Sequence, residues 1–282
     1  MKKYKEFLIT AEPFNPELLS SILWELEING INEDVNCLRV FAEMESSLTT
    51  DIIHLQLAKL QSEKLLREFR VEVSILEEKN WNEEWEKSLN VIQASDRIVI
   101  KPSSKNYEPK NNEIVITIDP KMSFGTGEHQ TTKLVIRLLE KYAQKGIKVL
   151  DAGTGTGILS IAAVKLGASD VIAFDIDDWC YENAKENSEL NNVTDKIDIR
   201  IGDINLIRER DFDMILANIQ KNILLELAGE FSGRLKQKGI ILLSGLLWDD
   251  EGDILEEYAS NGFTHLETIR MDDWIALSLI KS

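Results

Sequence analysis

The first quarter of the chain shows the repeat patterns of short strands and amphipathic helices. Between residues 16 and 27, apolar side chains recur every three or four positions, as on the inner face of a helix. Asn15 precedes this run as a candidate N-cap, and Gly30 follows it as the expected stop. The expected elements are a strand at 4–10, a helix at 16–27, a strand at 36–42, a helix at 51–64 and a strand at 70–76. This order predicts a small α+β domain over residues 1–76, a ferredoxin-like sandwich that needs one more strand.

Residues 77–95 are dense in Glu, Lys, Asn and Trp, and they predict a linker helix. Trp81 and Trp85 are four positions apart, so both would lie on one face of that helix. Two interpretations of this face stay open: it packs on a neighbouring domain, or it forms a contact surface for a substrate. Because residues 1–76 hold no cluster of catalytic residue types, we expect that domain to serve substrate recognition or scaffolding.

From residue 96 onward, apolar strands alternate with amphipathic helices. Strands are expected at 97–101, 114–118, 147–151, 171–175, 197–201, 212–217, 239–244, 263–270 and 273–280, and helices at 131–142, 157–167, 178–190, 221–235 and 250–260. Such alternation predicts an α/β domain over residues 96–282, with a doubly wound, mostly parallel sheet. A short turn joins the last two strands, which therefore predict a hairpin that adds an antiparallel strand.

The most informative segment is 149–157. An apolar strand ends in Asp151, three glycines follow at alternate positions, and an apolar helix begins. This pattern is typical of a nucleotide-binding turn, because backbone approaches a ligand closely only where Cβ is absent. A dinucleotide fingerprint would need a glycine in place of Ile158, and a Walker loop would end in Gly-Lys-Ser or Gly-Lys-Thr; neither is present. We therefore expect Asp151, Gly153 and Gly155 to belong to a cofactor site of another kind.

Polar residues also follow the other predicted strands, and in open α/β sheets ligands bind beyond the carboxyl ends of the strands. Asp175 lies about 20 residues after the glycine turn, where a carboxylate accepts hydrogen bonds from both ribose hydroxyls of an adenosine. Asp203 is a candidate acceptor for the adenine amino group, or a cap of a helix or turn. Asn218 ends a buried strand, so its carboxamide is placed to accept from an amine N–H and orient the nitrogen lone pair. A plain turn residue is the alternative for Asn218.

A Gly- and Thr-rich segment, residues 119–132, lies between a predicted strand and a predicted helix. Glycines beside hydroxyls suit a loop that folds over a cofactor. Thr131 or Thr132 is expected to cap the helix and to reach the cofactor. His129 is the histidine nearest to the expected site, and for it a general-base role and a structural role both stay open.

The glycine turn resembles motif I of class I methyltransferases that use S-adenosyl-L-methionine. From about residue 80 to its end, the chain resembles the bacterial methyltransferases of ribosomal large-subunit protein eleven. That resemblance rests on Phe124-Gly125-Thr126-Gly127-x-His129-x-Thr131-Thr132, Asp151-x-Gly153-x-Gly155-x-Gly157-Ile158-Leu159, Asp175-Ile176-Asp177, Ala217-Asn218-Ile219, Leu243-Ser244-Gly245 and Trp274-x-Ala276-Leu277. The sequence departs from the family at Gln220 and Ser104, where many relatives carry Leu and Trp.

The resemblance implies a mostly parallel, seven-stranded class I methyltransferase sheet and a ferredoxin-like amino-terminal domain that grips the substrate. It implies transfer of methyl groups from S-adenosyl-L-methionine to amino groups of that ribosomal protein, at lysine side chains or the N-terminal amine, without a metal. Carried over by position, the cofactor contacts would be Thr132, Gly153, Asp175 and Asn218, with Asn218 also catalytic. Asp151, Gly155 and Asp203 are further expected cofactor contacts, because they follow the carboxyl ends of predicted strands.

The composition of the chain limits the kinds of partner and the location that we expect for it. The 282 residues carry a formal net charge of −17, and an acidic surface repels phosphate backbones, so we expect a basic protein substrate and no direct nucleic-acid partner. Alternatively, the negative charge serves only the solubility of the protein and says nothing about its substrate. Two distant cysteines, Cys37 and Cys180, favour neither a disulfide framework nor a zinc site and are typical of the cytoplasm. No stretch is apolar enough for a signal peptide or a membrane helix, so we expect a cytoplasmic protein without a membrane partner.

Two other functions stay open. One is a methyltransferase for a different protein or a small amine; RNA as its target is disfavoured by the charge. The other is a non-catalytic module that binds the cofactor and recognises a partner. A nicotinamide oxidoreductase is disfavoured because the third glycine of its fingerprint is missing.

Overall fold

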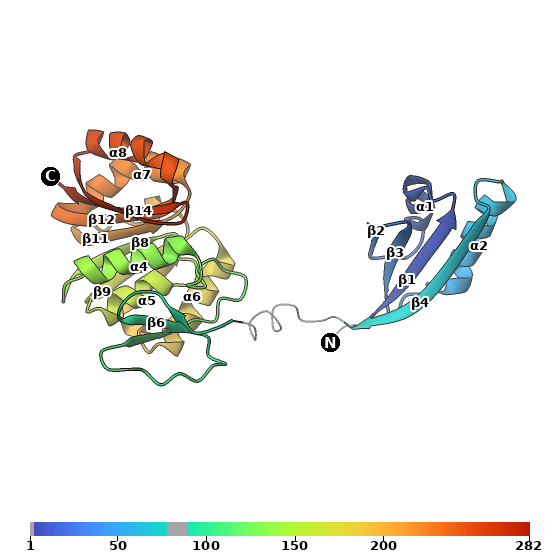
Figure 1. Cartoon of the computed structure of the whole chain (residues 1–282), viewed down its shortest axis with the longest axis horizontal. Helices are drawn as coiled ribbons and strands as arrows, with labels where there is room; N and C mark the ends of the chain where they lie inside the picture. The colour runs from blue at the N-terminus through green and yellow to red at the C-terminus, as the bar shows by residue number, and fades with distance from the viewer. Residues whose placement is uncertain (1–2, 78–88) are drawn as a thin grey trace. The chain divides into compact units, whose positions relative to one another are not determined.

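The computed structural model describes residues 3–77 and 89–282. The chain divides into two compact units, Met1–Trp81 and Asn82–Ser282 (Figure 1). Each unit has a hydrophobic core of its own. Among the described helices, none is both long enough and apolar enough to cross a membrane.

The smaller unit is a four-stranded antiparallel sheet with two helices. Its elements are β1 (Lys3–Glu12), α1 (Pro16–Leu23), β2 (Gly30–Asp34), β3 (Cys37–Glu43), α2 (Thr50–Ser62) and β4 (Glu68–Glu77). The strand order β2-β3-β1-β4 is the ferredoxin-like arrangement, so that prediction is confirmed. The missing strand is β2, which pairs with β3 across a two-residue turn in which Asn36 has a φ of +59°.

Each helix of this unit begins directly after a residue whose side chain caps it. Asn15 caps α1 as predicted, because its side chain accepts a hydrogen bond from the backbone N–H of Leu18. The helix ends at Leu23 and not at residue 27, since residues 24–27 form turns. Alternate strand residues and the inner helix faces meet in one core, made by Phe7, Ile9, Leu19, Leu23, Leu38, Val40, Ile53 and Leu57 among others.

The larger unit contains the predicted α/β sheet. Its elements are β5 (Ile92–Gln93), β6 (Ile98–Lys101), β7 (Ile114–Thr117), α4 (Gln130–Tyr142), β8 (Lys148–Ala152), α5 (Ile158–Lys165), β9 (Asp170–Asp175), α6 (Asp178–Leu190), β10 (Ile197–Ile201), β11 (Phe212–Asn218), α7 (Lys221–Arg234), β12 (Leu235–Leu247), α8 (Glu251–Ser260), β13 (Phe263–Met271) and β14 (Trp274–Lys281). Seven strands form one sheet in the order β10-β9-β8-β11-β12-β14-β13. β8 to β12 are parallel, and β14 lies antiparallel between β12 and β13, so the doubly wound sheet with a closing hairpin is confirmed.

Three short strands, β5, β6 and β7, form a second sheet beside the helices of the larger unit. The predicted linker helix at 77–95 falls mostly on residues 78–88, which lie outside the described residues together with Trp81 and Trp85. On either side of that gap, Glu77 ends β4 and Ile92–Gln93 form β5, so the helix does not extend over those positions.

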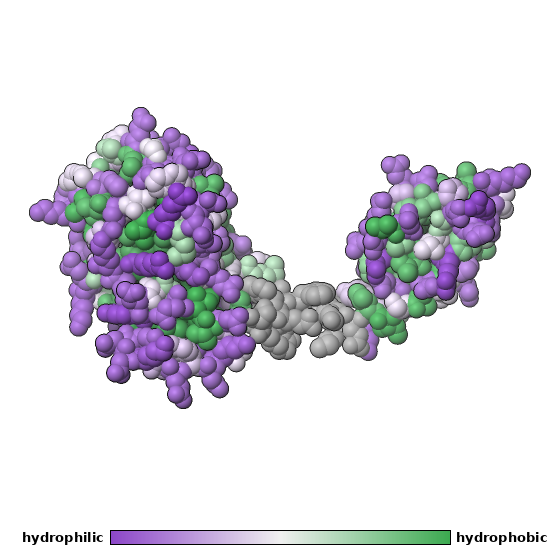
Figure 2. All heavy atoms as spheres, viewed as in Figure 1, coloured by the Kyte–Doolittle hydropathy of each residue, from purple (hydrophilic) through white to green (hydrophobic). Residues whose placement is uncertain are grey.

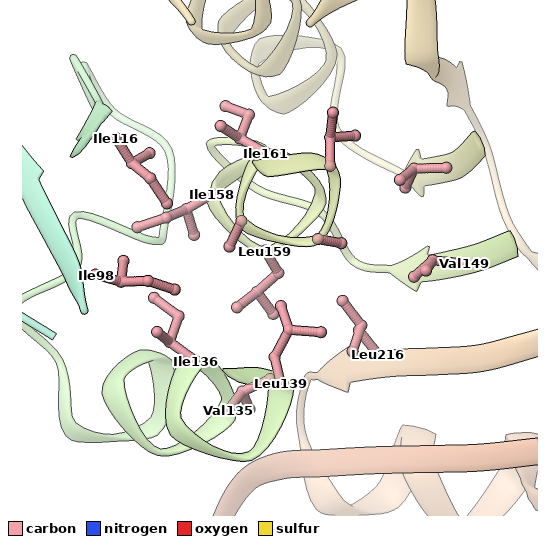
Figure 3. Packing of buried hydrophobic residues seen from close by; sticks show 14 of the residues in the cluster. Ile98, Ile116, Val135, Ile136, Leu139, Val149, Ile158, Leu159, Ile161 and Leu216 are labelled. Atoms are coloured by element: carbon pink, nitrogen blue, oxygen red, sulfur yellow. The ribbon is translucent and has the colours of Figure 1, made fainter. Parts of the chain in front are cut away.

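Helices cover both faces of the seven-stranded sheet and bury its apolar residues. On one face, Ile158, Leu159 and Ile161 of α5 lie at the centre of a cluster that includes Ile136 of α4 and Ile116 of β7 (Figure 3). The other face packs against α7 and α8 through a second cluster that includes Phe212, Phe231 and Tyr258. Figure 2 shows hydrophilic residues over most of the visible face of the larger unit, as expected when strands of this kind are buried on both sides.

Candidate cofactor and active site

A cavity of about 870 Å³ opens at the carboxyl ends of β8, β9 and β11. That is where ligands bind in open α/β sheets. Its wall contains six of the seven residues that the sequence assigns to cofactor contacts: Thr132, Gly153, Gly155, Asp175, Asp203 and Asn218. The predicted site residues therefore come together in one place, with one exception.

The glycine turn between β8 and α5 forms the floor of this cavity. Gly153 and Gly155 have φ values of +73° and +54°, which a residue with Cβ rarely adopts. A Cβ on Gly155 would also come within 2.4 Å of the backbone oxygen of Phe124. The turn therefore requires glycine for its conformation and for the close approach of the loop that carries Phe124.

Asp175 ends β9 and faces the turn. One of its carboxylate oxygens accepts the backbone N–H of Gly155 at 2.9 Å, and the other accepts the N–H of Asp177 at 3.2 Å. Each carboxylate oxygen can accept more than one hydrogen bond. Asp175 is thus held in place by the backbone while it keeps acceptor capacity toward the cavity, as a ribose-binding acid requires.

Asp151 is the exception, because it lies beneath the cavity wall and not on it. One carboxylate oxygen accepts hydrogen bonds from the hydroxyls of Thr154, at 2.8 Å, and Ser160, at 2.6 Å. The carboxylate therefore joins the glycine turn to the first turns of α5. Burial raises the pKa of Asp151 to about 6, although the two hydroxyls favour its charged form.

Two buried polar atoms on the cavity wall have no hydrogen-bond partner within the described chain: Oγ1 of Thr132 and Oδ1 of Asn218. An unpartnered buried polar atom costs stability. Oδ1 of Asp151 and Oδ1 of Asn183 also lack a partner among the described residues but lie off the cavity wall, whereas a ligand in the cavity would supply the missing bond at Thr132 and Asn218. Thr132 lies in the first turn of α4 and Asn218 at the end of β11. Together with the spare acceptor capacity of Asp175, they place polar groups along the cavity wall, and this donor and acceptor set fits the contacts that the sequence predicts for S-adenosylmethionine.

His129 caps α4, a position that the sequence analysis assigned to Thr131 or Thr132. Its Nδ1 accepts the backbone N–H of Thr131 at 3.3 Å and lies 2.8 Å from the Thr131 hydroxyl. The ring also packs edge-to-face against Phe124 and Trp274. Burial, helped by nearby Lys133, lowers the pKa of His129. His129 therefore has the structural role of a helix cap, with its Nδ1 engaged by Thr131.

Asp203 has the capping role that the sequence left open, and its contact with an adenine amino group stays a prediction. Its carboxylate accepts the N–H of Asn205 at 2.9 Å and so caps a short 3-10 helix (Ile204–Leu206), while the residue also lines the cavity. The same wall includes Ile223, Glu226 and Leu227 of α7, which sequence reasoning missed. These side chains carry no signal in the sequence, because an amphipathic helix shows the same pattern whether its flank faces solvent or a ligand cavity.

Comparison with known proteins agrees with this geometry. Residues 21–282 match the family model described as ribosomal protein L11 methyltransferase (PrmA). The ribosomal protein L11 methyltransferase of Brevibacillus brevis is 34% identical, over 98% of both chains. The protein of the same name from Acetivibrio thermocellus is 40% identical over 204 residues, which are 72% of this chain and 65% of that protein.

A solved structure, that of ribosomal protein L11 methylase from Lactobacillus delbrueckii subsp. bulgaricus, is 34% identical. It covers 69% of this chain and 100% of that one, with a TM-score of 0.65. The family model spans most of this sequence and includes every element that surrounds the cavity. The chain belongs to the ribosomal protein L11 methyltransferase family, whose members are S-adenosylmethionine-dependent methyltransferases.

Proposed function

We propose that this protein transfers methyl groups from S-adenosylmethionine to amino groups of ribosomal protein L11, at lysine side chains or at the N-terminal amine. Family membership supports the reaction class and the substrate. The observation that carries the site assignment is the unpartnered Oδ1 of Asn218, a buried acceptor on the cavity wall at the end of β11. A neutral amine has an N–H to donate to that oxygen and a lone pair left for attack.

The bound cofactor would supply an electrophilic methyl group on a sulfonium, which is already a good leaving group. The protein then contributes mainly position and the exclusion of water. Asn218 accepts the amine N–H and directs the nitrogen lone pair toward the methyl carbon. Asp175 and Thr132 hold the two ends of the cofactor, and the Phe124–His129–Trp274 cluster forms an apolar wall on the same cavity.

The amine must reach the site without its extra proton, because an ammonium has no lone pair. The arrangement of His129 does not provide a base at Nδ1, since that atom already accepts from Thr131. We therefore propose that the substrate proton leaves to water at the cavity mouth and that Asn218 orients the neutral amine that results.

We also propose which partners the protein has, what its domains do and where it acts. A net charge of −17 favours a basic protein substrate and disfavours a direct nucleic-acid partner. We assign residues 1–76 to substrate recognition, residues 77–95 to a linker, and residues 96–282 to cofactor binding and methyl transfer. The two thiols, Cys37 and Cys180, are free in the structure and suit the reducing cytoplasm, where this family's ribosomal substrates would be met.

Asn218→Ala tests the site assignment. Loss of the oriented acceptor should lower kcat for L11 methylation by about 10²-fold or more and cofactor affinity by much less, because Asn218 is one of several cofactor contacts but positions the reacting amine. Single-turnover kinetics and calorimetric cofactor binding, measured on the same preparation, separate the two effects. An unchanged kcat would reject the role of Asn218.

A further inference from the structure

Two asparagines of α6 and a third at its C-cap follow one face of the helix. Asn183, Asn187 and Asn191 are four positions apart, a spacing that stacks side chains along a helix, and all three are buried. A buried amide is costly unless its donors and acceptors are satisfied. Asn191 also donates to the carbonyl of Asn187 at 2.8 Å, and Oδ1 of Asn183 has no partner among the described residues. The other partners lie outside α6, in the chain that leaves β7 and in the glycine turn.

The asparagines bind the chain that leaves β7 as a neighbouring strand would. The side chain of Asn191 accepts the N–H of Thr117 at 3.0 Å and donates to its carbonyl at 2.6 Å. Two residues further on, the N–H of Asp119 donates to Asn187 at 2.9 Å, and its carbonyl accepts from Asn183 at 2.8 Å. Alternate residues of an extended chain present both backbone groups to the same side, so a ladder of side-chain amides can replace a strand.

Asn187 connects this ladder to the cofactor turn. Its Nδ2 donates to the carbonyl of Thr156 at 2.9 Å, while its Oδ1 holds Asp119. Thr156 in turn binds the middle of the same loop: its N–H donates to the carbonyl of Phe124 at 3.0 Å, and its hydroxyl to that of Gly125 at 2.8 Å. The loop is thus held at its start by α6 and at its middle by the glycine turn, and Asn187 contacts both anchors.

That loop builds one side of the cavity. Phe124, Gly125 and His129 lie on it and line the wall, and it leads into α4, which carries Thr132. If its start is released, Phe124 and the cap of α4 lose their fixed place relative to Asp175. Pre-organisation of a binding site strengthens affinity without any added contact to the ligand.

We infer that Asn187 is a positioning residue: it fixes the loop of residues 118–129 against the glycine turn and thereby sets the affinity for S-adenosylmethionine, without touching the cofactor. Asn183 and Asn191 hold the same loop at its start. The inference rests on the cofactor site of the proposed function, and it is independent of which amine is methylated.

The test compares Asn187→Ala with Ser188→Ala, a matched control. Ser188 is the next residue of α6, is equally buried, and its hydroxyl donates only to the carbonyl of Ala184 within the helix. Two properties of the full-length chain are measured: hydrogen–deuterium exchange of residues 118–130 without cofactor, and calorimetric affinity for S-adenosylmethionine. Asn187→Ala should speed exchange in the loop and weaken cofactor binding by about tenfold. Ser188→Ala should change neither, whatever it does to the unfolding free energy.

Asn183→Ala gives an independent second reading, because it removes one hydrogen bond to Asp119 and leaves Asn187 in place. It should raise loop exchange and weaken binding in the same direction and by less. Slow exchange and unchanged affinity in Asn187→Ala would overturn the inference, and so would equal effects in Asn187→Ala and Ser188→Ala. Because neither readout uses L11, failure of the proposed substrate would appear separately, as intact cofactor binding without methylation.

Discussion

At the scale of single residues, the site is marked by polar atoms that the protein leaves without a partner. Thr132 and Thr131 are adjacent, buried threonines in the first turn of α4. The hydroxyl of Thr131 lies 2.8 Å from Nδ1 of His129, whereas the hydroxyl of Thr132 has no partner among the described residues. We therefore expect the Thr132 hydroxyl to bind a ligand and the Thr131 hydroxyl to serve the fold.

Thr132→Val should leave the unliganded protein as stable as before, or more stable by about 1 kcal/mol, because valine removes an unsatisfied buried hydroxyl at nearly constant volume. The same change should weaken S-adenosylmethionine binding by about tenfold. Thr131→Val is the control. It should lower the free energy of unfolding and weaken S-adenosylmethionine binding less than Thr132→Val does. Denaturant titration and calorimetry measure both quantities. A loss of stability in Thr132→Val without a loss of affinity would mean that its hydroxyl serves the fold.

Asp151 predicts a pH dependence of stability with a definite sign. Burial raises its pKa to about 6 from 3.8, so between these values the folded protein holds a proton that the unfolded chain has released. The contribution of Asp151 to the unfolding free energy must then fall as pH rises through this window, by about 3 kcal/mol, and stay at the lower level above it. The difference in unfolding free energy between wild type and Asp151→Asn, followed from pH 4 to 7, isolates this effect. A flat difference would show that Asp151 is ionised throughout.

At the scale of elements, the glycine turn sets the geometry of the cavity. Gly155→Ala should destabilise the protein by more than about 1 kcal/mol and greatly weaken cofactor binding, because its φ is positive and the new Cβ would meet the Phe124 carbonyl at 2.4 Å. Gly252→Ala in α8 is the matched control. Nothing lies within 4 Å of its added Cβ, so it should stabilise the helix by about 0.5–1 kcal/mol and leave cofactor affinity unchanged. Thermal unfolding and calorimetry test the pair, and equal behaviour of the two variants would contradict this account of the turn.

Much of the element order was predictable because strands buried on both faces and amphipathic helices carry strong patterns. β2 was missed because it is short and polar, and it is fixed by pairing with β3 and not by burial of its own. The length of β12 was underestimated, since its first residues, from Leu235, extend through the polar Lys236–Lys238 segment before the apolar run begins.

The candidate site residues could be predicted because they lie at strand ends. The direction in which each side chain points could not be predicted. Asp151 pairs with Ala173 and Leu216 in the sheet, and both of those belong to the cluster under α5. Its carboxylate therefore points to the α5 face, where Ser160 binds it, and not forward into the cavity. Strand alternation defines two faces, but only the packed structure shows which face α5 covers. The asparagine ladder of α6 was likewise hidden, because its partners are backbone groups more than 30 residues away.

At the scale of the whole molecule, the two units have separate cores, which predicts separable functions. A fragment of residues 82–282 should fold and bind S-adenosylmethionine with the affinity of the full chain. Its methylation of L11 should fall by 10²-fold or more at low substrate concentration, about the contribution that a tethered second binding module makes. Calorimetry and initial-rate measurements on fragment and full chain decide this. Full activity of the fragment would remove the recognition role of the amino-terminal unit.

Methyl transfer to ribosomal protein L11 at the cavity beside Asn218 is the proposal on which the others depend. The decisive experiment incubates the full-length protein with methyl-labelled S-adenosylmethionine and purified, unmodified L11, alongside an extract in which other acceptors compete. We expect label on L11 in both samples and its loss in Asn218→Ala. Label on a different component, or no label on L11 although the cofactor binds, would contradict it.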